Sequence, residues 1–307
     1  MENNFGYLPW EQRVPDLQYQ NLLKEILENG EIHKPIHGEE TKRITGYLMR
    51  FKRNNGFTMT PTRDLLKYNL LQGAMGENIG FMNGARTLTE LANYGCPESF
   101  WKRWVTAEKC AKFGLTEGDL GPGSYGAAWA TFPKPDGTTF NQIEGMIRQM
   151  REVPMLRTIL IDPWIPFYTV SNDPKNQRSV VVAPCHGWVH IHIDTVNKTF
   201  KLEHKQRSAD APVGLQFNMM QYFGMGLMTE RVTGYHFDEL IYYISDAHIY
   251  ESQYEYVKRL IDCEPKKYPI VYLAEQAPTD NIFAFRPKDF IVEEYEPNPW
   301  FSIPTPI

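Results

Sequence analysis

A cysteine at the end of an interrupted strand is the first candidate for chemistry. Cys185 follows Pro184 and an apolar, β-prone run at residues 180–183. Proline has no N–H to give to a sheet ladder, so the regular strand is disturbed there and the thiol can project into a cleft. A buried structural cysteine is the ordinary alternative. The segment alone gives the two interpretations similar weight.

The next residue, His186, raises the idea of a Cys–His hydrolase. Adjacent side chains of an extended chain point to opposite faces, which makes His186 a poor base for Cys185. No separate Asn–His pair completes a protease site either. We therefore expect the thiol to act without His186 as its base.

Polar groups suited to an anion and a polar ring follow. Arg207 beside Ser208 offers a guanidinium fork and a hydroxyl donor, and near Cys185 the arginine would favour the thiolate. Asn218 carries an amide that can both donate to and accept from a ring edge. Taken singly, a solvated arginine and a helix N-cap are the better interpretations of Arg207 and Asn218.

Histidines form two further groups. His248 and Tyr250 share a face of an extended segment and together could hold a sugar hydroxyl, although a core-edge pair is individually the commoner case. His190, His192 and His204 could indicate a metal site. No cysteine or carboxylate clearly completes it, so we expect ordinary histidines of a sheet surface and no metal.

Composition limits the class of protein. The chain has 307 residues, 42% of them hydrophobic, and a net charge of −5, which argues against a general nucleic-acid binder. Its four cysteines show no paired spacing and fit free thiols in a reducing compartment. The beginning lacks a secretory pattern, and the most apolar stretch, residues 217–232, carries charges. A cytoplasmic protein without a membrane span is expected.

Hydrophobic periodicity predicts alternating runs of helix and strand. Helices are expected over residues 16–30, 77–94 with interruptions near Gly80 and Gly84, 141–150, 218–234 and 251–263. Strands are expected over residues 44–51, 158–161, 180–200, 200–207 and 241–249, with a hairpin turn at 194–198. Within residues 188–193, Trp188, His190 and His192 share one face. The absence of repeated βαβ units indicates an α+β fold.

The order and spacing of the motifs are more specific than any single one. Pro184-Cys185-His186, Gln206-Arg207-Ser208-Ala209-Asp210, Gly214-Leu215-Gln216-Phe217-Asn218 and Asp246-Ala247-His248-Ile249-Tyr250 together resemble the thymidylate synthase family. The resemblance is tightest over residues 180–253. It extends more loosely through residues 120–126, Trp101 and Trp104 to residues 49–51, and the ending at 303–307 looks like the family's apolar tail.

The resemblance implies an architecture and an assembly. We expect a single α+β domain over residues 1–307, with a mixed or antiparallel sheet packed against helices. Residues 1–15 would be an N-terminal extension, and residues 303–307 would close over the site. The family forms obligate homodimers through a sheet face, so Trp188, His190 and His192 would meet a partner. Arg157 would then reach across the interface to the partner's nucleotide.

The resemblance also implies a reaction, the transfer of a one-carbon unit from 5,10-methylenetetrahydrofolate to C5 of a pyrimidine nucleotide, without a metal. Cys185 would add to C6, Glu77 would act through water in proton transfers, and Tyr125 would assist removal of the C5 proton. Asp210 would join the catalytic group. The implied nucleotide-binding residues are Arg207, Ser208, Asn218, His248, Tyr250, Arg157 and Gln206, and the implied folate-binding residues are Trp101, Trp104, Asp210, Gly214 and Ile307.

Several positions depart from the family pattern. Thr158 stands where a second arginine is usual, and Gln216 replaces a usual proline. The early arginine-containing phosphate loop is not recognisable near residues 35–38, where Lys34, His37 or Arg43 could substitute. The helix that carries Glu77 lacks the family's usual aromatic and leucine run, so Glu77 is less firmly placed than Cys185.

Two products and one inactive alternative follow from the resemblance. Hydride transfer from the folate gives a methyl group, whereas water gives a hydroxymethyl group. Trp101, Trp104, Tyr125 and the apolar tail favour a dry site, and Asn218 favours uracil, so dUMP to dTMP is the first prediction. Hydroxymethylation of dUMP, dCMP or CMP is the alternative. A catalytically inactive homologue that binds nucleotide or RNA is less favoured, since Cys185 and Glu77 are both present.

Overall fold

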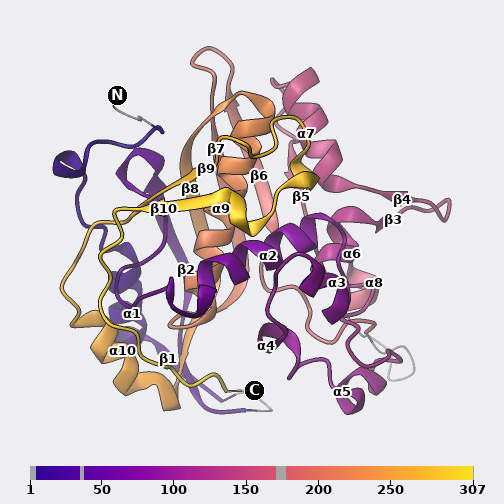
Figure 1. Cartoon of the computed structure of the whole chain (residues 1–307). Helices are drawn as coiled ribbons and strands as arrows, with labels where there is room; N and C mark the ends of the chain where they lie inside the picture. Colours follow the sequence, from indigo (N-terminus) through magenta and orange to yellow (C-terminus); the bar gives the residue numbers. More distant parts are fainter. Residues whose placement is uncertain (1–4, 35–37, 171–177, 307) are drawn as a thin grey trace.

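The computed structural model describes residues 5–34, 38–170 and 178–306. Its α-helices are α1 (Gln18–Asn29), α2 (Leu70–Met82), α3 (Leu88–Asn93), α4 (Glu98–Trp101), α5 (Ala107–Ala111), α6 (Tyr125–Ala130), α7 (Gln142–Glu152), α8 (Pro166–Thr169), α9 (Gly214–Thr233) and α10 (Tyr254–Ile261) (Figure 1). Its strands are β1 (Glu31–His33), β2 (Thr41–Lys52), β3 (Phe132–Pro133), β4 (Thr139–Phe140), β5 (Leu160–Ile161), β6 (Trp188–Asp194), β7 (Thr199–Asp210), β8 (His236–Tyr250), β9 (Ile270–Leu273) and β10 (Phe290–Glu293). Short 3-10 helices are Trp10–Gln12, Arg53–Asn55, Lys67–Asn69, Glu251–Gln253, Ile282–Ala284 and Pro287–Asp289.

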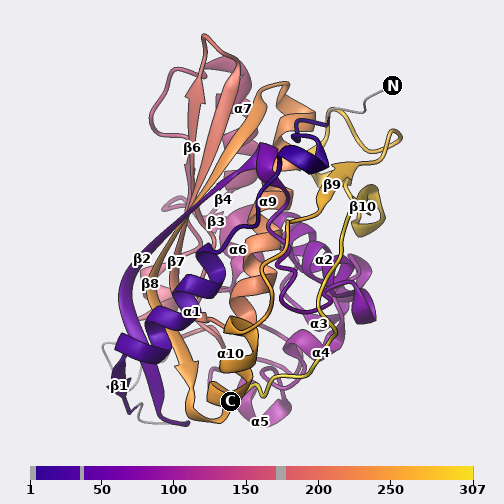
Figure 2. The same ribbon diagram turned by 90° about the vertical axis from the view of Figure 1, so that its left-hand side faces the viewer.

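A mixed sheet of six strands, in the order β1-β2-β8-β7-β6-β5, is the centre of the described fold (Figure 2). Strands β7 and β8 pair in parallel, while the other neighbours pair antiparallel. Helix α9 connects β7 to β8, and a crossover of this kind is what a parallel pair requires. The predicted α+β class is confirmed.

The helices α9 and α2 form the core against one face of the sheet. Nearly every residue of α9 from Leu215 to Thr229 is buried, and α2 is buried from Gly73 to Met82. A helix that is apolar on all sides belongs inside a protein, between other elements. Their close approach needs a glycine, because a Cβ on Gly224 would come within 2.6 Å of the Met75 sulfur.

The other face of the sheet is more open. Along β6 the side chains of Val189 and Ile191 are buried against the helices, while His190 and His192 point the other way. On β2, Leu48 is 53% exposed. The predicted alternation in β6 is confirmed, and the open face combines apolar and charged groups.

Three expectations about element bounds were wrong. The segment before Cys185 forms no strand, because β6 begins only at Trp188. Asn218 is not an N-cap: α9 already begins at Gly214, so Asn218 lies in its second turn. Helix α2 begins seven residues before Glu77 and stops at Met82, and Gly84 then takes a left-handed φ of 85° that ends the helical run.

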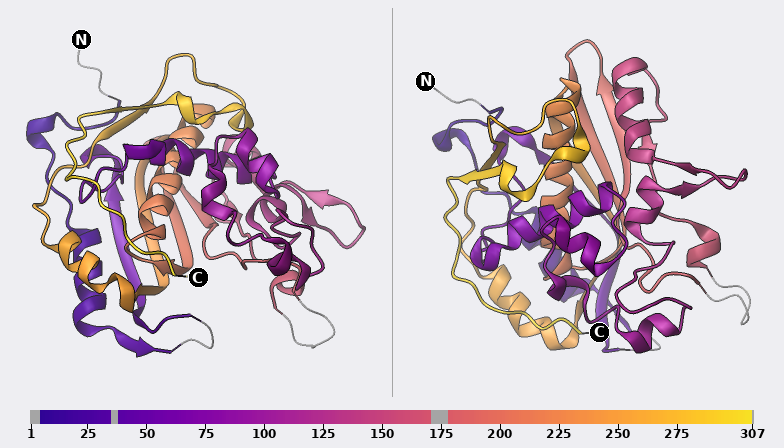
Figure 3. Two further views of the ribbon diagram at one scale, coloured as in Figure 1. Left: turned by 60° about the horizontal axis from the view of Figure 1, so that its bottom comes forward. Right: turned by 45° about the vertical axis from the view of Figure 1, so that its right-hand side comes forward.

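The segment after β10 runs past α10 to the loop between α4 and α5 (Figures 1 and 3). Hydrogen bonds hold it along its length, among them one from the Asn298 N–H to the Pro61 carbonyl at 2.9 Å, and two more lie near its end. Gln253 donates to the carbonyl of Pro304 at 2.8 Å, and Arg103 donates to the carbonyl of Thr305 at 3.0 Å. None of the described helices is long and apolar enough to cross a membrane.

Candidate active site

Strand β7 holds the loop that carries Cys185. The backbone N–H groups of Arg207 and Ser208 donate to the Cys185 carbonyl at 2.7 and 3.3 Å. The Cys185 N–H donates to the Tyr125 hydroxyl at 2.8 Å. The loop is therefore fixed from both sides without being a strand, and Cys185 is half-buried.

The guanidinium of Arg207 is aimed at the sulfur. Its Nη2 donates to Cys185 Sγ at 3.3 Å and to the Ala183 carbonyl at 3.2 Å, and its Nε donates to the Pro184 carbonyl at 3.1 Å. A fixed positive charge at this distance stabilises negative charge on sulfur. The structure therefore brings together Cys185 and Arg207, which the sequence separates by a hairpin.

Glu77 is buried on the inner side of α2. Trp101 Nε1 donates to its Oε1 at 2.5 Å, and Gln221 Nε2 donates to its Oε2. Burial raises the pKa of Glu77 to about 7, although both hydrogen bonds oppose that rise. A carboxyl with a pKa near neutrality can both take up and release a proton at physiological pH.

A continuous chain of side-chain hydrogen bonds leads from Glu77 to the sheet. Asn218 Nδ2 donates to Gln221 Oε1 at 2.9 Å, and Gln206 Nε2 donates to Asn218 Oδ1 at 3.0 Å. Tyr242 donates its hydroxyl proton to Gln206 Oε1. We call these five side chains the amide relay.

Ionised Glu77 fixes the direction of the amide relay. A carboxylate only accepts hydrogen bonds, so Gln221 must turn its amide nitrogen toward Glu77 and its oxygen toward Asn218. Asn218 must then donate to Gln221 and accept from Gln206. One N–H and one lone pair of the Asn218 amide remain for another molecule.

Aromatic side chains surround His186. Tyr125 lies between the rings of Phe81 and His186, stacked at 4.8 and 4.4 Å, and His186 Nδ1 lies 2.6 Å from the Tyr222 hydroxyl. Burial lowers the pKa of His186 to about 3. Burial also raises the pKa of Tyr125 well above its usual value, with negative charge on Cys185 adding to the rise. Both rings are therefore neutral near pH 7.

Asp210 lies where β7 ends and the chain turns to α9. Gln253 Nε2 lies 3.2 and 3.3 Å from its two carboxylate oxygens and also donates to Pro304. Burial raises the pKa of Asp210 to about 6, while His248 and Gln253 act in the opposite direction. Gln253 thus links Asp210 to the C-terminal segment.

The sugar-site candidates lie side by side as predicted. His248 and Tyr250 meet edge to face at 5.2 Å, and Asp246 lies 2.8 Å from His248 Nδ1. Arg43 forms an ion pair with Asp246 at 3.5 Å, whereas Lys34 pairs with Glu40 at 3.3 Å. Of the two described candidates for the missing phosphate arginine, Arg43 is therefore the one beside the sugar-site pair.

Two cavities share His186 in their linings. The larger, of about 400 Å³, is lined by Glu77, Ser99, Phe100, Trp101, Arg103, Trp104, Val182, His186, Asp210, Val213, Gly214, Phe217, Asn218 and Thr305. The smaller, of about 280 Å³, is lined by Asp162, Pro163, Trp164, Pro184, Cys185, His186, Trp188, Lys205, Arg207 and Ser245. The structure thus gathers the described predicted folate residues, Trp101, Trp104, Asp210 and Gly214, with Glu77 and Asn218 in one cavity, and the thiol with Arg207 in the adjoining one.

The remaining predicted residues lie around these cavities. Gln206 is buried within the amide relay, and Ser208 binds Cys185 through its backbone. Arg157 is exposed, and only its carbonyl has a described contact, with His190 Nε2 at 2.9 Å. Ile307 and residues 35–37, which include His37, lie outside the described residues.

Sequence reasoning missed Gln221, Gln253 and Arg103. Gln221 lies three residues after Asn218 on α9, a spacing that places two side chains on one helix face. That spacing was the available signal, but it required knowing that Asn218 is inside the helix. Nothing in the sequence pattern marked Gln253 or Arg103 as contacts of the tail.

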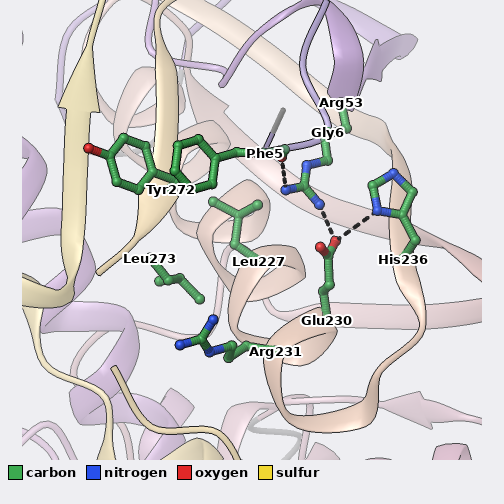
Figure 4. Close-up of a pocket in the computed structure, with 9 residues that line it drawn as sticks. All are labelled: Phe5, Gly6, Arg53, Leu227, Glu230, Arg231, His236, Tyr272 and Leu273. Atoms are coloured by element: carbon green, nitrogen blue, oxygen red, sulfur yellow. Dashed lines mark hydrogen bonds and ion pairs between the residues drawn. The ribbon is translucent and has the colours of Figure 1, made fainter. Parts of the chain in front are cut away.

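A third cavity, of about 270 Å³, lies between the N-terminal segment and the end of α9 (Figure 4). In it Glu230 pairs with Arg53, accepts the Phe237 N–H at 2.7 Å and lies 3.5 Å from His236 Nδ1. Arg53 also donates to the Phe5 carbonyl. These contacts attach the N-terminal segment, although Arg53 Nε has no hydrogen-bond partner among the described residues. None of these groups is a predicted site residue.

The fold and the arrangement around Cys185 define the candidate active site of an enzyme, with a thiol and a guanidinium beside a cavity lined by polar and aromatic side chains. The family model for thymidylate synthase matches residues 17–307, so the chain belongs to the thymidylate synthase family. It is a one-carbon transferase acting on a pyrimidine nucleotide, with methylenetetrahydrofolate as the family's co-substrate.

Proposed function

We propose that this enzyme converts dUMP to dTMP. The observation that carries the proposal is the direction of the amide relay. With Glu77 ionised, Asn218 has one donor and one acceptor left, the complement of O4 and N3–H of uracil. Cytosine in the same pose presents a donor and an acceptor in exchanged positions and would need the amide reversed.

In this proposal Cys185 adds to C6 of the ring, which makes C5 nucleophilic toward the folate's one-carbon unit. Glu77 acts through water in the proton transfers, and its pKa of about 7 suits that role. Tyr125 assists removal of the C5 proton as a neutral phenol, since its raised pKa opposes ionisation. Loss of the C5 proton expels the folate amine and leaves an exocyclic methylene on the base. Hydride from the tetrahydrofolate then reduces the methylene to methyl as the C6–S bond breaks, which restores the Cys185 thiolate and leaves dihydrofolate.

The binding roles follow the same proposal. Arg207, Ser208 and Gln206 would serve the phosphate and the base side of the nucleotide, and His248 with Tyr250 the sugar hydroxyl. Trp101, Trp104, Asp210, Gly214 and Ile307 would serve the folate. Support comes from the cavity of about 400 Å³, which Trp101, Trp104, Asp210 and Gly214 line.

Methylation rather than hydroxymethylation is supported by how the site is enclosed. Water must be kept from the exocyclic methylene until hydride arrives. Trp101 is only 8% exposed, and the C-terminal segment is tied to Gln253 and Arg103 at Pro304 and Thr305. These contacts favour a closed, dry cavity.

A single assay tests the reaction. The enzyme is incubated with methylenetetrahydrofolate and dUMP, dCMP or CMP in separate reactions, and the products are analysed by mass. We expect dTMP and dihydrofolate from dUMP. A hydroxymethyl product with tetrahydrofolate would replace the proposal by hydroxymethylation, and faster turnover of dCMP or CMP would overturn the base assignment.

Asn218→Asp should exchange the base preference. Ionised, the new carboxylate repels O4 of uracil and accepts from the amino group of cytosine, so we expect kcat/KM for dUMP to fall by about 100-fold relative to dCMP. Asn281→Asp is the matched control, because Asn281 is the N-cap of the 3-10 helix Ile282–Ala284 and lines neither cavity, and it should leave the ratio unchanged. An unchanged ratio in the Asn218 variant would remove the role of the amide relay in base choice.

We also propose that the chain acts as a homodimer through the open face of the sheet, with Arg157 reaching the partner's nucleotide. Exposed apolar side chains support this: Met155 is 81%, Leu156 45% and Leu48 53% exposed. Isolated exposed apolar residues are ordinary. Here Leu48 lies on the open face, and Met155 and Leu156 lie in the segment that leads into the edge strand β5, which favours an interaction surface. Sedimentation of the full chain measures this part of the proposal, and a monomer would contradict it.

A further inference from the structure

Two histidines and a glutamate meet on the open face of the sheet. His190 and His192 are two residues apart on β6, and β7 places Glu203 directly opposite His190. Their possible ligand atoms all lie within 4.8 Å of one another. His204 cannot join them, because it is buried on the other face of the sheet.

We propose that His190, His192 and Glu203 form a binding site for Zn²⁺ or a divalent transition-metal ion of similar ligand preference. Two imidazole nitrogens and one carboxylate oxygen are a donor set that Zn²⁺ uses. In the proposed homodimer this face meets the partner subunit, so the remaining coordination positions fall to water or to groups at that interface. The spacing suits them, since residues i and i+2 of a strand share a face and the cross-strand neighbour is the next side chain on it.

The three side chains would have to move only slightly to coordinate one metal ion. His192 Nε2 lies 2.9 Å from Glu203 Oε2, and the two rings have centroids 4.2 Å apart. In a tetrahedral zinc site, neighbouring ligand atoms are roughly 3.3 Å apart, given metal–ligand distances of about 2.0–2.2 Å. Contraction from at most 4.8 Å to that value needs only side-chain rotation.

Neighbouring groups orient His190 and Glu203 but leave one carboxylate oxygen of Glu203 available to a metal ion. The hydrogen bond between His190 Nε2 and the Arg157 carbonyl holds that ring in place. Lys205 lies 3.5 Å from Glu203 Oε1, while the contact with His192 uses Oε2. The carboxylate can therefore keep its ion pair through one oxygen and offer the other to a metal.

The proposed metal site is distinct from the reaction centre. Trp188 and Lys205, the opposed pair two positions earlier on the same two strands, line the cavity that contains Cys185. His190, His192 and Glu203 line neither of the two cavities of the candidate active site. The metal would brace β6 against β7 and would take no part in the transfer.

Calorimetric titration of chelator-treated full-length protein with ZnCl₂ tests the site, and Co²⁺ gives a visible absorption spectrum as a second readout. We expect one ion per chain. His192→Ala and Glu203→Gln should each weaken binding at least about tenfold, whereas His236→Ala, an exposed histidine elsewhere on the sheet, should not.

The thiol of Cys185 is a competing zinc ligand, so each titration is repeated in a Cys185→Ser background. Binding that survives in that background and is lost in His192→Ala supports the site. Binding that disappears with Cys185, binding that both ligand variants leave unchanged, or no binding at all would overturn it. Circular dichroism of the variants separates a lost ligand from a lost fold.

Discussion

Cys185→Ser is expected to lose turnover by a factor on the order of 10⁴ or more, as is usual when a covalent nucleophile is removed. The serine hydroxyl stays protonated at neutral pH, and the contact from Arg207 at 3.3 Å then has no anion to stabilise. Product formation from dUMP and the folate measures the effect. A covalent ternary complex with 5-fluoro-dUMP and the folate should form with the wild type and be absent in the variant.

The control is Cys263→Ser, since Cys263 is also half-buried but its sulfur contacts only the carbonyls of Thr62 and Arg259. It should retain both turnover and the covalent complex. Nucleotide binding and melting temperature should be close to wild type in both variants. Substantial turnover by Cys185→Ser would contradict the assigned nucleophile.

Glu77→Gln is expected to lower kcat by about 10²–10⁴-fold, the usual contribution of a positioned acid–base group. The substitution preserves size and the contact with Trp101 but removes the proton acceptor. In the wild type, kcat should rise with pH through about 7 as the buried carboxyl ionises. A variant that keeps most of its kcat, or a wild-type profile without that step, would refute the role.

The pH dependence of the unfolding free energy provides an independent measurement of the Glu77 pKa. The pKa of this carboxyl is raised from 4.5 in the unfolded chain to about 7 in the folded protein, so the folded state binds more protons between these values. Its stabilising contribution is therefore complete below pH 4.5 and is lost as pH rises through 7. Relative to Glu77→Gln, the wild type should lose about 3 kcal/mol of unfolding free energy over this interval. Parallel curves for the two proteins would contradict the raised pKa.

The sequence was most informative where chemistry and spacing coincide. Cys185, Arg207, Asn218 and His248 are far apart along the chain, yet their order and intervals indicated one family, and the family model covers residues 17–307. The α+β class and the alternating faces of β6 followed from local hydrophobic periodicity. Periodicity reports which side of an element is buried, and both features depend on that alone.

The sequence was least informative where partners are brought together by tertiary packing. An asparagine before an apolar run looks the same as an N-cap or as a buried residue of a helix that began four positions earlier, as Asn218 did. The contact of Glu77 with Gln221 depends on how α2 packs against α9. Similarly, Glu203 completes the histidine pair only because the register of β6 and β7 places it opposite His190.

In the function proposed above, base choice and the protonation of Glu77 both depend on the five side chains of the amide relay. Uracil, with N3–H and a C4 carbonyl, fits the hydrogen-bond direction that an ionised Glu77 imposes on Asn218. Cytosine has the reversed pattern and fits the opposite direction, which a protonated Glu77 permits. Coupling between two binding equilibria is reciprocal, so the nucleotide shifts the proton affinity of Glu77 as much as the proton shifts the affinity for the nucleotide. The preference for uracil over cytosine is therefore expected to depend on pH. It increases as the solution becomes more alkaline and decreases as Glu77 is protonated.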